Sequence, residues 1–101
     1  MKFSIITVTF NSAATLEHTI RSVAAQDYPG KEHIIVDGGS TDGTADIISR
    51  FRIHISKFVS EKDEGLYDAI NKGIALADGD VIGILHSDDF YLQNDVLRRY
   101  A

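Results

Sequence analysis

The chain has 101 residues, no cysteine and a formal net charge of −5 at pH 7. This length suits a single domain over residues 1–101 with a sizeable hydrophobic core. The absence of cysteine excludes a disulfide framework and a thiolate metal site, and the acidic balance argues against nucleic-acid binding, which relies on Lys and Arg at the phosphates.

The N-terminus shows no targeting signal. Met1 and Lys2 lead directly into a strand-like stretch, without the apolar segment and cleavage site of a signal peptide. No run approaches the roughly 18 apolar residues of a membrane span. We therefore expect a cytoplasmic protein with no transmembrane segment; the alternative is a full-length protein peripheral to the inner face of a membrane.

Strand and helix patterns alternate along the chain. Strands are predicted from runs of β-branched and aromatic residues, and helices from apolar residues spaced three and four apart. A cap at Asn11 or Ser12 begins the first helix, which ends before Tyr28-Pro29-Gly30. The expected strands are 3–10, 33–36, 53–60 and 81–85, and the expected helices after the first are 44–51, 66–77 and 94–100.

This alternation predicts an α/β fold, a doubly wound and mostly parallel sheet of about four strands with flanking helices. The third strand is expected at an edge, because Lys57 interrupts it. The fourth, an uninterrupted apolar run, has the pattern of a central strand covered on both faces.

Two neighbouring carboxylates, Asp88 and Asp89, follow the fourth strand. Ligands of open α/β sheets bind at the carboxyl ends of the strands. Adjacent carboxylates repel each other, so a hard divalent cation would keep both ionised. An ordinary turn is nearly as good an explanation for this pair alone.

Further acidic residues follow the second and third strands. Asp37 opens a glycine-containing loop, Asp37 to Gly43, that suits close approach of a ligand. The loop matches neither a phosphate-binding P-loop nor a dinucleotide fingerprint, and Asp42 is expected to cap the next helix. Asp63 lies in the charged run Glu61 to Gly65, which is either part of the pocket or a solvated surface. His86, two residues before the acidic pair, is either a packing residue or a ligand.

Four segments together resemble family 2 glycosyltransferases of GT-A fold. They cover essentially the whole chain: Ile5 to Asn11 with the later Ser22 and Gln26, His33 to Thr44, Ser60 to Gly73, and Gly79 to Asp89. The resemblance implies a metal-dependent, inverting transfer of a sugar from a nucleotide-sugar, expected to be a UDP-sugar, to an acceptor in polysaccharide or glycan biosynthesis.

The resemblance also implies roles for individual residues. Ser87-Asp88-Asp89 is similar to the family's DXD motif, with Asp88 toward the ribose or metal and Asp89 as ligand of Mg2+ or Mn2+. Asp37 matches the aspartate that binds uridine. The other implied donor-binding residues are Thr7, Thr9, Asn11 and Asp63.

The resemblance has limits. Many relatives carry an arginine where this chain has Ile70, so Lys72 is the remaining candidate cation near the diphosphate. Relatives are more than twice as long, and their second half supplies the acceptor site and the catalytic base, expected beyond Ala101. The alternative function is an inactive nucleotide-binding or oligomerisation module. With that half absent, the fourth strand is expected to lie at an open edge that pairs with a second copy, giving a homodimer.

Overall fold

The computed structural model describes residues 1–87, 91 and 93–100. Four parallel strands form one sheet in the order β3-β2-β1-β4. In chain order the elements are β1 (Phe3–Thr9), α1 (Ala13–Ala24), β2 (Lys31–Asp37), α2 (Thr44–Arg50), a 3-10 turn η1 (Arg52–His54), β3 (Lys57–Ser60), α3 (Leu66–Leu76), β4 (Val81–Ile84) and α4 (Val96–Tyr100).

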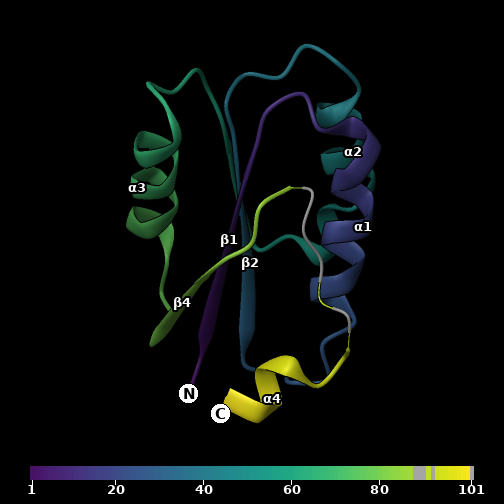
Figure 1. Ribbon diagram of the computed structural model, residues 1–101, viewed down its shortest axis with the longest axis vertical. Coiled ribbons are helices and arrows are strands. Elements are labelled where there is room, and N and C mark those ends of the chain that lie inside the picture. The colour runs from purple at the N-terminus through teal and green to yellow at the C-terminus, as the bar shows by residue number, and fades with distance from the viewer. Residues whose placement is uncertain (88–90, 92, 101) are drawn as a thin grey trace.

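Helices cover both faces of this sheet. α1 and α2 lie on one face and α3 lies on the other (Figure 1). Residues alternate between the faces, so that Ile6 and Val8 of β1 pack with Ala69 of α3, while Ile35 of β2 packs with Leu16 of α1 and Ile48 of α2. The predicted doubly wound, parallel α/β fold is confirmed.

The third strand begins later than predicted. Residues 52–54 form the turn η1, and only Lys57–Ser60 pair with β2. The apolar residues at 53 and 55 suggested a strand, but Ile53 is 89% exposed, whereas Ile55 packs beneath α2. The prediction that this strand lies at an edge is confirmed.

The fourth strand is not the central strand that its apolar run indicated. β4 pairs with β1 alone among the described strands. Val81, Ile82 and Ile84 are consequently between 38% and 42% exposed. The apolar pattern indicates side chains suited to burial, but it does not determine where a strand lies in the sheet. Among the described strands, β4 lies at an edge of the sheet.

The first turns of α1 and α2 are stabilised together by one carboxylate. Ser12 precedes α1 as predicted, but its side chain makes no capping hydrogen bond. Asp42 instead accepts a hydrogen bond from the Ala13 N–H at 3.3 Å and another from the Thr44 N–H at 2.9 Å. The N-cap of α2 is Gly43 rather than the predicted Asp42. The Thr44 hydroxyl also donates to Asp42 and lowers the pKa of that carboxyl.

Candidate functional site

The loops after β1, β2 and β3 lie together at one end of the sheet (Figure 1). Parallel strands all point the same way, so residues that follow each of them gather at this end. The chain leaves β1 at Phe10, β2 at Gly38 and β3 at Glu61. This brings together most of the polar residues that the sequence singled out.

Asp37 organises the loop that follows β2. Asp37 is 1% exposed. Its carboxylate accepts hydrogen bonds from the Ser40 N–H, the Ser40 hydroxyl and the Ser60 hydroxyl, the last at 2.7 Å. A carboxylate has about four acceptor sites, so roughly one remains. Asp37 therefore joins its own loop to the end of β3.

Asn11 joins the same loop to β1. Its side-chain oxygen accepts from the Thr41 N–H at 2.8 Å, and its own N–H donates to the Ser40 hydroxyl at 2.8 Å. Asn11 has a positive φ of 49°, a conformation that asparagine tolerates better than most residues. The loop is thus held from both neighbouring strands.

A pocket of about 280 Å3 opens beside this loop, on the α3 side of the sheet. Thr9 and Phe10 line it from β1, and Asp63 and Gly65 from the segment before α3. The lining is completed by Val8, Leu66 and Ala69. Phe10 is 59% exposed, which leaves its ring free to contact a planar ligand.

Asp63 supplies a carboxylate to this pocket. Thr9 also lines it, but its hydroxyl is buried, without a hydrogen-bond partner among the described residues, because alternation along β1 turns the Thr9 side chain to the face opposite Val8. The Asp63 carboxylate accepts from the Gly65 N–H at 3.2 Å and lies against Gly38, where an added Cβ would be 3.0 Å from its Oδ2. Glycine at 38 therefore allows the loop and Asp63 to approach closely.

Phe10 and the serine donors to Asp37 were not among the residues that the sequence predicted for the site. The alternation of β1 contained the signal for Phe10, because it continues the face of Ile6 and Val8 beyond the last paired residue. Ser40 and Ser60 carried no comparable signal, since only the β2–β3 pairing brings Ser60 beside Asp37.

Thr7 does not reach the pocket. It is fully buried, and its hydroxyl forms a 2.7 Å hydrogen bond with His33 Nε2 on β2. Both side chains lie on the α1 side of the sheet, away from α3. Of the predicted donor-binding residues, Thr9 and Asp63 line the pocket and Thr7 does not.

Lys72 lies near the segment that follows β3. Its ammonium group pairs with Glu61 at 3.2 Å and with Asp68 at 3.4 Å, and donates to the Lys62 carbonyl. These contacts tie α3 to the charged run before it. Any role of Lys72 toward a phosphate would require the ammonium group to exchange at least one of these partners.

Asp88 and Asp89 lie outside the residues that the structure describes. The chain leading to them is described as far as Ser87, whose hydroxyl donates to the Ser12 hydroxyl at 2.8 Å. His86 is exposed. Within the described part of the chain, no three His, Cys, Asp or Glu residues form a group able to hold a metal ion.

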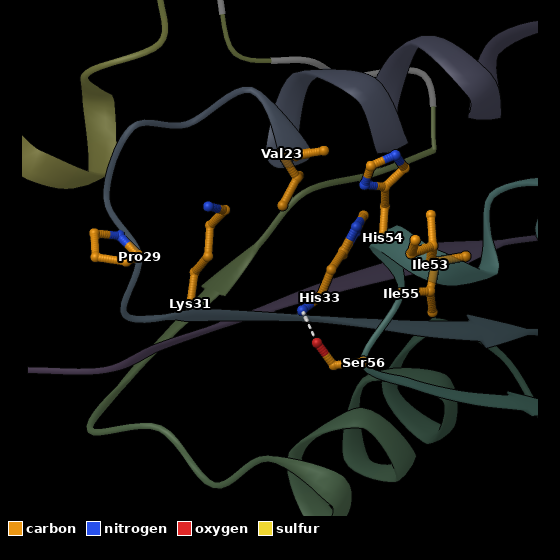
Figure 2. A pocket seen from close by; sticks show the side chains of 9 residues that line it. Val23, Pro29, Lys31, His33, Ile53, His54, Ile55 and Ser56 are labelled. Carbon is orange, nitrogen blue, oxygen red and sulfur yellow. Dashed lines mark hydrogen bonds between the residues drawn. The ribbon is translucent and has the colours of Figure 1, made fainter.

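A second pocket, of about 300 Å3, lies on the α1 side of the sheet, between β2, the end of α1 and η1. Figure 2 shows Lys31, His33 and His54 directed into it from β2 and η1. The main-chain N–H of His33 donates to the Ser56 hydroxyl at 3.1 Å. Burial lowers the pKa of His33 to about 4, so its imidazole is neutral at pH 7. Asp37 and Asp63 do not line this pocket.

An open parallel sheet with a loop-lined pocket at the carboxyl ends of its strands defines an α/β ligand-binding domain. The chain matches the model of glycosyl transferase family 2 over residues 4–100 and belongs to that family. None of the helices in the described ranges is long and apolar enough to cross a membrane.

One relative is an uncharacterized glycosyltransferase of Mycobacterium tuberculosis, 44% identical over 95 residues. The match covers 93% of this chain and 36% of that relative. The chain therefore spans little more than a third of this relative's length.

Two solved structures share the fold. TarS 1-349 of Staphylococcus aureus in complex with UDP-GlcNAc has a TM-score of 0.88 at 28% identity, covering 99% of this chain and 30% of TarS. The mannosyltransferase PcManGT of Pyrobaculum calidifontis in complex with GDP-Man and Mn2+ also has a TM-score of 0.88 at 28% identity, covering 95% of this chain and 30% of its own. The four-stranded sheet is the N-terminal half of a GT-A fold.

Proposed function

We propose that residues 1–101 form the donor-binding domain of a metal-dependent, inverting glycosyltransferase that uses a UDP-sugar. The observation that carries the proposal is the pocket at the strand ends, where Thr9, Phe10 and Asp63 meet beside the loop held by Asp37. Its mixed apolar and polar lining suits a nucleoside, which has a flat apolar base and hydroxyl-bearing ribose.

Each lining residue has a proposed role. The exposed ring of Phe10 stacks on the base, the Asp63 carboxylate binds polar groups of the nucleoside, and Thr9 contacts the donor as part of the pocket wall. Asp37 binds uridine through its remaining acceptor site and, with Asn11, holds the loop in place. We propose no direct donor contact for Thr7, because its hydroxyl is buried against His33.

Mg2+ or Mn2+ is the proposed metal, with Asp89 as its ligand and Asp88 toward the ribose or metal. The hydroxyl and carboxylate oxygens of Ser87-Asp88-Asp89 are the hard ligands that these ions prefer. When bound, the ion supplies Lewis-acid stabilisation of the departing nucleoside diphosphate. The complexes of TarS with UDP-GlcNAc and of PcManGT with GDP-Man and Mn2+ support the donor class.

The transfer itself is proposed to proceed by direct displacement, with inversion at the anomeric carbon. A carboxylate base then takes the proton of the acceptor hydroxyl. We assign that base to no residue of this chain. The acceptor is proposed to belong to polysaccharide or glycan biosynthesis.

Calorimetric titration with UDP in the presence and absence of Mn2+ tests the proposal. The chain is expected to bind UDP, and Mn2+ is expected to tighten the binding. Asp89→Ala should remove most of the metal-dependent gain, and Phe10→Ala should weaken uridine and UDP alike, by about tenfold for one lost stacked ring.

Asp80→Ala is the matched control for the loss of one carboxylate. Asp80 is exposed and accepts from the Lys2 N–H at the opposite end of the sheet. It should leave UDP binding unchanged. Absence of UDP binding by the unaltered chain, or equal Mn2+-dependent binding by the Asp89→Ala variant, would contradict the proposal.

A further inference from the structure

One face of α1 and the turn after it carry three buried polar residues where a core-facing helix normally has apolar ones. Thr19, Ser22 and Gln26 are between 1% and 9% exposed. Buried polar side chains cost stability unless they are hydrogen-bonded. Each of these three is hydrogen-bonded to the main chain of the segment that follows β4.

The hydrogen bonds are spread along that segment. The Thr19 hydroxyl donates to the Ser87 carbonyl at 3.0 Å. The Tyr91 N–H donates to the Ser22 hydroxyl at 3.2 Å. The Gln26 side chain donates to the Gln93 carbonyl at 2.7 Å and accepts from the Leu97 N–H at 3.0 Å. Each of these hydrogen bonds joins residues that are between 67 and 71 positions apart in the sequence.

Two of these bonds flank residues 88–90 in the chain. Thr19 holds Ser87 immediately before them, and Ser22 holds Tyr91 immediately after. Apolar contacts support both sides, because Leu85 and Leu97 belong to the same core cluster as Val23 of α1, with Tyr91 packed against it. The chain is therefore fixed to α1 on either side of Asp88 and Asp89.

We infer that Thr19, Ser22 and Gln26 are positioning residues for the metal-binding carboxylates. Thr19 and Ser22 act through the main chain at Ser87 and Tyr91. Gln26 acts further along the segment, at Gln93 and Leu97. None of the three is proposed to contact donor or metal. Losing one of these bonds would loosen the main chain at Ser87 or at Tyr91 and weaken metal-assisted donor binding. The nucleoside pocket, formed by β1 and the segment before α3, would be unaffected. This inference rests on the proposed function.

Two variants, Thr19→Val and Ser22→Ala, test the inference at the two ends independently. Each removes one hydroxyl with little change of volume. We expect each to weaken UDP binding in Mn2+ by about three- to tenfold, the value of one net hydrogen bond. The affinity for uridine in the absence of metal should change by less than about twofold. Binding of Mn2+, followed by the electron paramagnetic resonance of the free ion, should weaken in parallel.

Conservative and matched substitutions serve as controls. Thr19→Ser keeps the hydroxyl and should restore binding in Mn2+ to that of the unaltered chain. Thr15→Val makes the same change as Thr19→Val one helical turn earlier, at an exposed residue whose hydroxyl donates to the Ser12 carbonyl at the start of its own helix. It should have no effect on UDP or Mn2+. Thermal melting identifies any variant that fails to fold, in which case the other end of the segment still provides the test.

The outcomes separate this inference from the proposed function. Absent Mn2+-dependent UDP binding by the unaltered chain, or its persistence in Asp89→Ala, overturns both. If Asp89→Ala loses that binding while Thr19→Val and Ser22→Ala retain it, only the positioning role is overturned. Equal losses of uridine and UDP affinity in these two variants also overturn it, because they indicate a general structural role.

Discussion

At the scale of residues, two buried titratable groups stand next to each other on β2 and face opposite sides of the sheet. Burial alone would raise the pKa of Glu32. Hydrogen bonds from the Asp78 N–H and the Ser4 hydroxyl, together with the ion pair with Lys57, outweigh burial and lower the pKa to about 2. His33 has a pKa lowered to about 4 by burial alone. The folded state therefore prefers ionised Glu32 and neutral His33.

His33 predicts a loss of stability in mild acid. The unfolded histidine takes up a proton near pH 6.5, whereas the folded one resists protonation until about pH 4. Between these values the unfolded state binds more protons, so stability falls as the pH falls. Between pH 7 and pH 5 we expect the free energy of unfolding to fall by about 2 kcal/mol because of His33. Glu32 adds to the acid sensitivity only below about pH 4.5.

Urea unfolding at pH 7 and pH 5 measures this loss. His33→Gln, which stays neutral and can still bond to Thr7, should lose about 2 kcal/mol less over this range than the unaltered chain. Asn71→Ala, at an exposed position of α3, removes no titratable group and should keep the original pH dependence. An identical pH dependence in His33→Gln would contradict the assignment to His33.

At the scale of elements, α3 packs unusually close to β1, and Gly73 makes this possible. A Cβ added at Gly73 would lie 2.5 Å from Ile6 Cγ2, and Ile6 is fully buried. The same close packing places the start of α3, with Leu66 and Ala69, against Val8 at the pocket. A glycine inside a helix is thus required by packing between layers, despite its low helix propensity.

Gly73→Ala sets two effects against each other. Helix propensity favours alanine by about 1 kcal/mol, whereas overpacking costs about 1 to 3 kcal/mol. We expect overpacking to prevail, with a net loss of about 1 to 2 kcal/mol in urea unfolding. Asn71→Ala, at an exposed position of α3, should be neutral or slightly stabilising. A stabilised Gly73→Ala variant would show that α3 can move away from β1 at little cost.

At the scale of the whole molecule, the two edges of the sheet differ. At β3, Lys57 pairs with Asp78 at 2.6 Å and with Glu32 at 3.3 Å, and a charged residue discourages pairing with another strand. β4 reads Val-Ile-Gly-Ile and carries no charge. Its apolar side chains are partly exposed, so β4 is the edge at which we expect a second copy to pair.

Light scattering during size-exclusion chromatography tests this prediction. The chain should shift from monomer toward dimer as its concentration rises, and Ile82→Lys on β4 should keep it monomeric. Ile74→Lys removes a similarly exposed isoleucine on α3, 43% against 42% exposed, and should leave dimerisation unchanged. A chain that stays monomeric at the highest concentration would contradict pairing through β4.

Local patterns in the sequence were sufficient to predict most of the helices and strands, and to predict which end of the sheet carries the pocket. Strand and helix periodicities arise from neighbouring residues, and parallel strands bring their carboxyl ends together, so Asp37 and Asp63 were expected at one site. The four family segments likewise identified glycosyl transferase family 2, which the family match over residues 4–100 confirms.

Only the tertiary structure decided what depends on pairing between distant segments. The position of β4 at an edge, the exposure of Ile53 and the bond of Thr7 to His33 follow from which strands and helices become neighbours. The same is true of Ser60 beside Asp37 and of the α1 side chains that hold Ser87 and Tyr91. A sequence pattern predicts whether a side chain is buried or exposed. Which residue it contacts depends on how the whole chain packs.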